Sequence, residues 1–144
     1  MVEPKGRLIV FEGVDAAGKT TLCDDLCESL RHKQLPVQRY QFPGKTPGTL
    51  GELVDRIHHH HRDKFCIPGV NPCALQLLHI AAHIDIIESA IKRAVSEGAW
   101  VVLDRFWWST YVYGRDGGVS EQSLELMIQL EKTAYSGPIR PPIP

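Results

Sequence analysis

One segment near the N-terminus has the residue types and spacing of a loop that binds polyphosphate. It matches the pattern G-x-x-x-x-G-K-[ST] at every required position, between an apolar run and an amphipathic stretch. Glycines allow such a loop to curl so that its N–H groups face an anion, and the helix that follows adds the positive end of its dipole. The loop would consist of Gly13, Val14, Asp15, Ala16, Ala17, Gly18, Lys19, Thr20 and Thr21. Lys19 would then bridge the β- and γ-phosphates of a nucleotide, and Thr20 would bind Mg²⁺.

The pair Asp104 and Arg105 follows a second apolar run, residues 99–103, which we interpret as a strand. In open α/β sheets, ligands bind at the carboxyl ends of the strands, so this pair is predicted to lie beside the phosphate loop. A carboxylate at that place can organise the shell of Mg²⁺, and an arginine can bind phosphate oxygens that gain charge during transfer. The alternative is an Asp–Arg ion pair on the surface.

The pattern of apolar residues predicts the elements that must hold these groups in place. A continuous apolar run is typical of a strand covered on both faces, and a period of three to four residues is typical of a helix. Asn71 and Pro72 suit the start of a long helix, Gly98 suits its end, and Ser120 can cap a final helix. Strands are predicted at residues 8–11, 37–42 and 99–103, helices at 19–34, about 50–57, 72–97 and 120–134, and a loop at 62–71. The fold class is therefore α/β, with a parallel sheet covered by helices on both faces.

Length and composition limit the classes to which the chain can belong. Its 144 residues suffice for one domain, and a formal net charge of −1 gives no general attraction to nucleic acid or membranes. The apolar runs are far shorter than the roughly 20 residues that cross a bilayer, and the N-terminus does not resemble a secretion signal. We therefore expect a cytoplasmic protein that binds neither nucleic acid nor membranes. The cysteines are expected to be reduced, and Cys23 and Cys27 fit buried positions better than a metal site.

Three segments of the chain resemble the thymidylate kinase family of P-loop nucleoside monophosphate kinases. They are LIVFEGVDAAGKTT at residues 8–21, QFPGKTPGTLGELV at 41–54 and VVLDRFWWSTYVYG at 101–114. With the long helix that joins the last two, they cover most of residues 7–140. The resemblance implies a three-layer P-loop kinase fold, ATP and Mg²⁺ as cofactors, and transfer of the γ-phosphoryl group to a (deoxy)nucleoside monophosphate, most readily dTMP to dTDP. It also implies a homodimer built on the long helix.

The resemblance further implies a role for residues on the acceptor side. Asp15 would turn toward the 3′-hydroxyl of the acceptor sugar, the alternative being a simple loop residue. Arg105 would contact the acceptor phosphate together with Lys45, which stands where the family has an arginine and could instead be a solvated turn residue. The acceptor site would comprise Asp15, Phe42, Lys45, Arg105, Ser109 and Tyr113. The catalytic residues would be Lys19, Asp15, Arg105 and Asp104, and the metal ligands Thr20 and Asp104.

Histidines stand at two places where the sequence leaves their role open. In the long helix the family carries an aromatic residue that stacks on thymine and an arginine that binds its edge. These positions fall on Ile80 and Ile84 or, with a shift of one residue, on His79 and His83, so the base of the acceptor is left open. In the run of histidines at residues 58–61, only the first and last share a helix face. A solvated helix end is therefore preferred to a metal site.

The family continues beyond the end of this sequence. Its members carry a further strand, a lid with an arginine and the segment that holds adenine after the region that resembles residues 136–141. This sequence ends at Pro144. We therefore expect one kinase-like domain, residues 1–144, that is truncated at its C-terminus or completed by a partner chain. A deoxynucleoside kinase and a nucleotide-binding remnant without turnover are the alternative functions.

Overall fold

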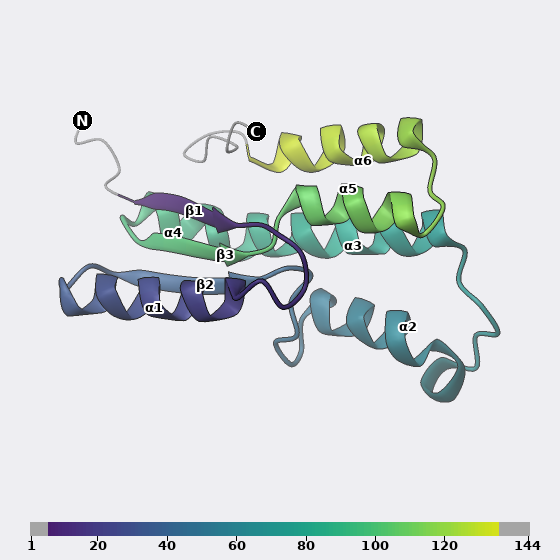
Figure 1. Ribbon diagram of the computed structural model, residues 1–144, viewed down its shortest axis with the longest axis horizontal. Coiled ribbons are helices and arrows are strands. Elements are labelled where there is room, and N and C mark those ends of the chain that lie inside the picture. Colours follow the sequence, from purple (N-terminus) through teal and green to yellow (C-terminus); the bar gives the residue numbers. More distant parts are fainter. Residues whose placement is uncertain (1–5, 136–144) are drawn as a thin grey trace.

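A computed structural model describes residues 6–135. A parallel sheet of three strands lies toward one end of the molecule, at the left in Figure 1. The strands are β1 (Arg7–Phe11), β2 (Val37–Gln41) and β3 (Trp100–Asp104), in the order β1-β3-β2, and β3 pairs in parallel with both neighbours. The register places Phe11 and Gln41 opposite Asp104. The strands thus end at the same edge of the sheet, and the predicted parallel α/β fold is confirmed.

Helices cover both faces of this sheet. The helices in the described part of the chain are α1 (Lys19–His32), α2 (Leu50–Phe65), α3 (Pro72–Ile86), the π-helix η1 (Ile87–Ile91), α4 (Lys92–Ser96), α5 (Trp107–Asp116) and α6 (Glu121–Ala134). Val102 of β3 shares a buried cluster with Cys27 of α1 on one face, whereas Val101 and Leu103 share another with Ile91 on the opposite face. Burial on both faces explains the continuous apolar run of β3.

Two predicted helix starts are confirmed at residues whose side chains cap the backbone. Asn71 Oδ1 accepts a hydrogen bond from the N–H of Cys73 at 2.9 Å at the start of α3. Ser120 Oγ accepts one from the N–H of Ser123 at 3.2 Å at the start of α6. Each cap satisfies a backbone donor that the helix itself leaves unpaired. These starts could be predicted because donor and acceptor lie within three residues of each other.

The long helix predicted at residues 72–97 runs from Pro72 to Ser96 as α3, η1 and α4 in succession. Its first part packs against α2, α5 and α6, and its last part packs on β3. By length and composition this segment could cross a bilayer, and 33% of its most apolar 18-residue window is buried. The central helix of a soluble fold meets the same criteria. No other helix within residues 6–135 meets them.

The second helix is longer than the sequence predicts. Residues 62–71 were expected to form a loop, but α2 continues to Phe65 with a kink at His60 (φ −135°). The apolar period that predicts a helix stops at Ile57, because the residues that follow are mostly polar and exposed. A helix on the surface needs no apolar stripe in its last turns, so the apolar period predicts a helix that is too short.

Two of the four buried residues of α1 are cysteines. Cys23 and Cys27 are 0% and 1% exposed, whereas Leu22 is 52% exposed although it belongs to the apolar period of the helix. Burial raises the pKa of the Cys23 thiol to about 11, so the thiol stays protonated at neutral pH. All four cysteines are free. The prediction that Cys23 and Cys27 act as small apolar residues in the core is confirmed.

Candidate active site

The phosphate loop joins β1 to α1, and its last glycine begins the helix. Gly18 is the N-cap of α1 in the left-handed conformation (φ 81°), and Lys19 is the first helical residue. Lys19 is 8% exposed, and its ammonium donates a hydrogen bond to the carbonyl oxygen of Val14 at 2.5 Å. The side chain therefore lies across the loop and brings a positive charge inside it. Together with the N-terminus of α1, this charge makes the loop a suitable site for an anion.

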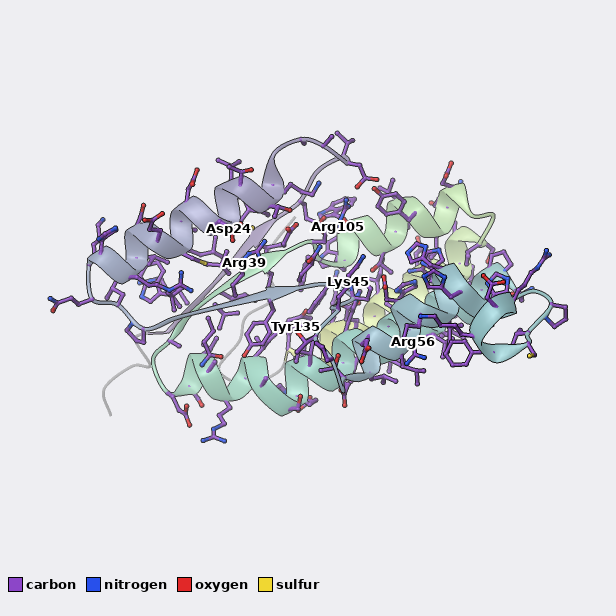
Figure 2. All side chains as sticks on the ribbon, turned by 90° about the horizontal axis from the view of Figure 1, so that it is seen from below. Asp24, Arg39, Lys45, Arg56, Arg105 and Tyr135 are labelled. Atoms are coloured by element: carbon purple, nitrogen blue, oxygen red, sulfur yellow. The ribbon has the colours of Figure 1, made fainter. Side chains whose placement is uncertain are left out.

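The first turn of α1 contacts the carboxyl end of β3. The Thr20 hydroxyl donates a hydrogen bond to Asp104 Oδ2 at 2.8 Å, although the two residues are 84 positions apart. Asp104 is 1% exposed, and Arg39 Nη2 lies 3.4 Å from the same oxygen. Arg39 Nε lies 3.2 Å from Asp24 of α1 (Figure 2). The two residues predicted to bind Mg²⁺ are thus in contact beside the loop, next to an arginine that no motif indicated.

Arg105 is the centre of a cluster at the mouth of the phosphate loop. Its guanidinium pairs with the Asp15 carboxylate, donates to the Ser109 hydroxyl at 3.2 Å and lies over the Tyr113 ring, 5.3 Å from the ring centre. The Arg105 N–H donates to the carbonyl oxygen of Phe11 at 2.9 Å. Its φ of 74° is strained for a residue with a side chain, and such strain is typical of functional sites. Arg105 therefore brings three other predicted site residues together.

The Asp15 carboxylate is held in its charged form. A hydrogen bond from Tyr113 lowers the pKa of Asp15, and the charges of Arg105 and Lys19 act in the same direction. The contact with Asp15 in turn raises the pKa of Tyr113, so the phenol keeps its proton. Asp15 is exposed at the tip of the loop. Its ionised carboxylate can accept a hydrogen bond from a hydroxyl group, which is the property that binding a sugar requires.

Glu12 is a site residue that the sequence motifs did not indicate. Its carboxylate accepts hydrogen bonds from the N–H of Ser109 at 3.2 Å and from the Ser109 hydroxyl at 2.5 Å. These bonds tie the start of the phosphate loop to the first turn of α5, and they orient the hydroxyl that Arg105 contacts. One signal could have found Glu12. It is an acidic residue directly after the first strand, at the sheet edge that also carries Asp104.

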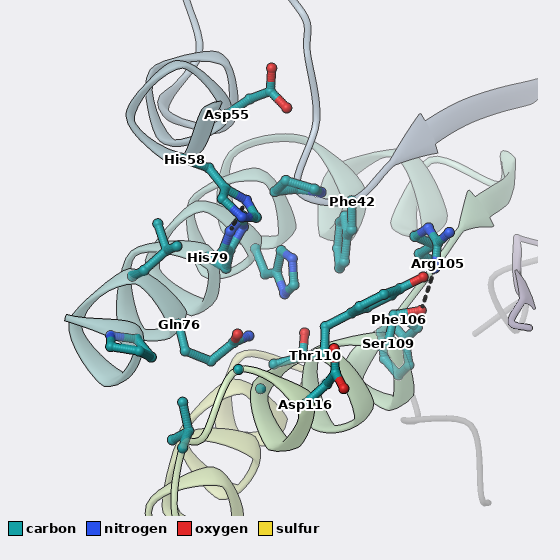
Figure 3. A pocket seen from close by; sticks show the side chains of 18 of the residues that line it. Phe42, Asp55, His58, Gln76, His79, Arg105, Phe106, Ser109, Thr110 and Asp116 are labelled. Carbon is teal, nitrogen blue, oxygen red and sulfur yellow. Dashed lines mark hydrogen bonds between the residues drawn. The ribbon is translucent and has the colours of Figure 1, made fainter. Parts of the chain in front are cut away.

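A cavity of about 560 Å³ lies where α2, α3 and α5 gather beyond the carboxyl ends of the strands (Figures 1 and 3). In Figure 3, Arg105 and Ser109 lie at the end near the sheet, and His58, His79 and Gln76 lie at the far end. The cavity has the size of a typical small-molecule site. Its lining includes all six residues predicted to bind the acceptor: Asp15, Phe42, Lys45, Arg105, Ser109 and Tyr113.

Phe42 and Lys45 reach the cavity from the segment that follows β2. Phe42 is 2% exposed and stacks on the ring of His83, with ring centres 4.2 Å apart. The Lys45 side chain is 64% exposed, and its ammonium lies 3.5 Å from Asp55 of α2. Phe42 is thus a fixed part of the wall, whereas Lys45 is exposed enough to turn toward an anion in the cavity.

The long helix presents histidines, and not isoleucines, to the cavity. His79 and His83 line it, whereas Ile80 is 1% exposed and shares a buried cluster with Leu124 of α6. Ile84 packs against two of the core clusters. Of the two placements that the sequence left open, the geometry supports the one shifted by one residue. The reason is that α6 covers the face of α3 that carries Ile80.

The histidine run at residues 58–61 lies inside α2. The sequence had suggested a helix end instead. His58 lines the cavity, and its Nδ1 lies 3.2 Å from Nε2 of His79 (Figure 3). His59 and His60 are exposed. Within the part of the chain that the structure describes, no group of three or more His, Cys, Asp or Glu residues is arranged to hold a metal ion.

His79 responds to pH differently in the folded and unfolded chain. Its pKa is lowered to about 4, first by burial and then by the imidazoles of His58 and His83, against an opposing effect of Asp55. An unfolded chain has an ordinary histidine pKa of about 6.5. Between these two values the unfolded chain binds more protons than the folded one. The free energy of unfolding therefore falls as the pH drops from about 6.5 to about 4.

We expect the variant His79→Gln to lose less stability on acidification than the unchanged protein. From pH 7 to pH 5, the contribution of His79 should lower the free energy of unfolding by about 1–2 kcal/mol, and this loss should be absent in the variant. Urea denaturation at both pH values measures the difference. His32→Gln is the control, because the His32 side chain is 78% exposed on α1. An equal loss in all three proteins would contradict the expectation.

Comparisons with known proteins show to which family the chain is similar. A profile of the thymidylate kinase family matches residues 11–142. The chain is 37% identical over 139 residues to thymidylate kinase of Pseudomonas fluorescens (strain SBW25), covering 94% of this chain and 60% of that protein. It is 35% identical over 124 residues to thymidylate kinase of Chlorobium chlorochromatii (strain CaD3), covering 85% and 53%. The crystal structure of thymidylate kinase from Ehrlichia chaffeensis matches with a TM-score of 0.73 at 27% identity, covering 92% of this chain and 70% of that one.

The match includes every part of the site described above. The family profile begins at Phe11, directly before Glu12 and the phosphate loop, and it extends beyond α6. The chain spans between 53% and 60% of the length of the two curated relatives named here. The profile covers most of the chain, and the fold of a solved relative agrees with it. The chain belongs to the thymidylate kinase family.

Proposed function

We propose that this chain transfers the γ-phosphoryl group of ATP to a nucleoside monophosphate, with dTMP as the preferred acceptor. Membership of the thymidylate kinase family supports the reaction class. One observation carries the proposal for this chain. Asp15 belongs to the phosphate loop, and both Asp15 and its partner Arg105 line the cavity that contains the other acceptor residues. A donor held in the loop and an acceptor held in the cavity would therefore meet at Arg105.

On the donor side, the loop would hold the polyphosphate of ATP. Lys19 would contact the β- and γ-phosphates, because its ammonium already lies inside the loop. Mg²⁺ prefers oxygen ligands and is usually bound by one or two protein groups, with water and phosphate completing its shell. The Thr20 hydroxyl and the Asp104 carboxylate, 2.8 Å apart, fit this requirement. Bound there, Mg²⁺ would neutralise charge on the β- and γ-phosphates.

On the acceptor side, Arg105 and Lys45 would bind the monophosphate. A phosphate can compete with Asp15 for the Arg105 guanidinium, because both are anions that an arginine binds through paired hydrogen bonds. The Asp15 carboxylate would then be available to the 3′-hydroxyl of the sugar. Phe42 and Tyr113 would form the walls beside the nucleoside, and Ser109 would orient Arg105.

The proposed reaction requires little covalent chemistry from the protein. An oxygen of the acceptor phosphate forms a bond to the γ-phosphorus while the bond from that phosphorus to the β-phosphate oxygen breaks, and ADP leaves. Positioning the two nucleotides in line and neutralising the charge on the transferred group account for most of the rate. Lys19 and Arg105 supply the positive charges nearest to that group.

The proposal is tested by separating binding from turnover. Calorimetry with Mg²⁺ and ATP measures donor binding to the chain, and titration with dTMP, dUMP, dCMP and dGMP measures acceptor binding. Labelled ATP then shows which monophosphate becomes a labelled diphosphate. We expect ATP to bind and dTMP to be the best acceptor. Labelling of thymidine without labelling of dTMP would contradict the proposal, and so would a failure to bind any monophosphate.

We also propose that two copies pair through the long helix. The apolar window of this helix is only 33% buried, and Leu77 is 47% exposed on α3. Light scattering should then give a mass of twice 16.2 kDa. Leu77→Ser should weaken the pairing, whereas Leu126→Ser, at a residue 60% exposed on α6, should not. A monomer at micromolar concentration, or equal effects of the two variants, would contradict a dimer of this kind.

A further inference from the structure

A buried contact between a histidine and a glutamate connects the wall of the cavity to α6. His83 lines the cavity and is 3% exposed, and its Nδ1 lies 3.1 Å from Oε2 of Glu131, which is 0% exposed. The two residues are 48 positions apart and come from α3 and α6. None of the roles proposed above uses Glu131. Burying a carboxylate costs several kcal/mol unless a partner compensates it, so the pair needs a reason beyond packing.

The surroundings of Glu131 offer it one basic partner. Within residues 6–135, His83 is the only basic group paired with this carboxylate. The other titratable group beside it is the buried Tyr135, whose pKa is raised first by burial and then by Glu131, so its phenol is neutral. Glu131 Oε1 and the Tyr135 hydroxyl are both buried without another hydrogen-bond partner among the described residues. The phenol can therefore add a neutral hydrogen bond, but it brings no positive charge.

Aromatic rings enclose the pair on its other sides. Phe42 of the cavity wall stacks on His83, with 4.2 Å between ring centres, and Phe106 stacks on Phe42 at 6.2 Å. Phe106 also meets Tyr135 edge to face at 5.0 Å. On its own helix His83 is near His79, which burial keeps neutral at physiological pH. No second charge from these neighbours competes with Glu131 for His83.

This arrangement orients the imidazole ring of His83 and places its Nδ1 against the Glu131 carboxylate. An ionised carboxylate can only accept a hydrogen bond, so the contact with an ionised Glu131 requires a proton on Nδ1 of His83. A fully buried carboxylate that faces one basic side chain forms an ion pair only when that side chain is an imidazolium. An imidazolium carries a proton on both nitrogens. Nε2 makes no hydrogen bond to another residue in the described part of the chain, and the ring lines the cavity. In the imidazolium form, Nε2–H is thus a hydrogen-bond donor without an acceptor among residues 6–135.

We propose that Glu131 is a positioning residue for the recognition of the acceptor base: it holds His83 as an imidazolium whose Nε2–H selects a carbonyl oxygen on the edge of that base. The inference rests on the proposed function and makes it more specific. Thymine and uracil carry an acceptor oxygen at position 4, where cytosine carries an amino group that donates. A donor at Nε2 therefore favours dTMP and dUMP over dCMP. Glu131 itself does not touch the nucleotide.

The pair dUMP and dCMP gives the sharpest binding test, because both lack the methyl group of dTMP and differ at position 4 of the base. Calorimetry should show that the unchanged protein binds dUMP roughly 10- to 100-fold more tightly than dCMP, as expected for one charge-assisted hydrogen bond gained or lost. In Glu131→Gln this preference should largely disappear while the affinity for ATP stays the same. Glu125→Gln, at an exposed residue of the same helix, should keep the preference.

The charge of His83 has a readout that needs no ligand. Nitrogen-15 NMR distinguishes imidazolium from neutral imidazole, and comparison with His83→Gln identifies the His83 signals among the seven histidines. We expect an imidazolium in the unchanged protein at neutral pH, a neutral ring in Glu131→Gln, and a shift of the Nε2 signal when dUMP is added. The NMR spectrum also reports whether each variant is folded.

Different results overturn the inference and the proposed function. A neutral His83 in the unchanged protein, or an equal affinity for dUMP and dCMP, would overturn the role of Glu131 while leaving the kinase proposal intact. A preference that survives in both Glu131→Gln and His83→Gln would do the same. If the unchanged protein binds ATP but no monophosphate at all, the proposed function fails, and the inference fails with it. If Glu131→Gln does not fold, His83→Gln and the NMR spectrum of the unchanged protein still decide the question.

Discussion

Replacing Lys19 with methionine is expected to reduce the affinity for ATP by two to three orders of magnitude, on the order of 100- to 1,000-fold, because two charge-assisted contacts to the β- and γ-phosphates are lost. The side chain lies across the phosphate loop, and its ammonium donates to the carbonyl oxygen of Val14. Methionine has a similar length and no charge, so it can occupy the same space. We therefore expect little change in the melting temperature and a large change in binding.

The measurement is calorimetry with ATP in the presence of Mg²⁺, supported by thermal denaturation. Lys33→Met is the matched control, because Lys33 is an exposed residue at the other end of α1. It should bind ATP as the unchanged protein does, which would show that the effect depends on position and not on net charge. Equal ATP affinity in Lys19→Met and the unchanged protein would remove the assignment of a nucleotide to this loop.

Features formed by neighbouring residues could be predicted from the sequence. The phosphate loop is a run of adjacent residues, and its left-handed Gly18 and the start of α1 at Lys19 follow from that run alone. The caps at Asn71 and Ser120 span two or three residues. The meeting of Thr20 with Asp104 could also be predicted, because the carboxyl ends of neighbouring parallel strands lie at one edge of the sheet.

Contacts that depend on how helices pack could not be predicted in the same way. Glu12 and Ser109 are 97 positions apart, and their contact requires the exact placement of α5 against the phosphate loop. Glu131 contacts His83 only because α6 packs on α3. A signal for Glu131 does exist in the sequence. It is a charged residue on the same helix face as Leu124 and Ile128, where an apolar residue would be expected.

The family's two base-contacting positions could be placed on the long helix in two ways, and the apolar periodicity could not decide between them. Apolar residues surround α3 on nearly every side, so the pattern does not say which face is turned toward the cavity. His79 and His83 are four residues apart and share a face, as do Ile80 and Ile84. Only the position of α6, which covers Ile80, separates the alternatives. The choice between the two placements therefore stayed open until the tertiary packing was known.

The second large effect is expected for Arg105, whose replacement with alanine should weaken the binding of dTMP roughly 10- to 100-fold and leave ATP binding little changed. Arg105 lines the acceptor cavity, and its guanidinium contacts the phosphate loop through Asp15. The left-handed backbone at this residue, with φ of 74°, is equally strained for arginine and alanine. The substitution therefore removes the guanidinium without adding backbone strain.

Two further variants separate binding from structure. Arg105→Lys keeps the charge but loses the planar group that contacts Asp15 and Ser109 together, so its affinity for dTMP should lie between those of the alanine variant and the unchanged protein. Arg115→Ala is the control, because Arg115 lies on the same helix with a side chain that is 50% exposed. Titrations with dTMP and with ATP are compared for each protein. An equal loss of both affinities in Arg105→Ala would mean that Arg105 serves to hold Asp15 and Ser109 in place and not to bind the acceptor phosphate. Recognition of the acceptor phosphate requires a selective loss of dTMP binding in Arg105→Ala and an intermediate affinity for dTMP in Arg105→Lys. This result would show that the charge and the geometry of Arg105 both contribute to binding the acceptor, and that neither contributes to binding ATP.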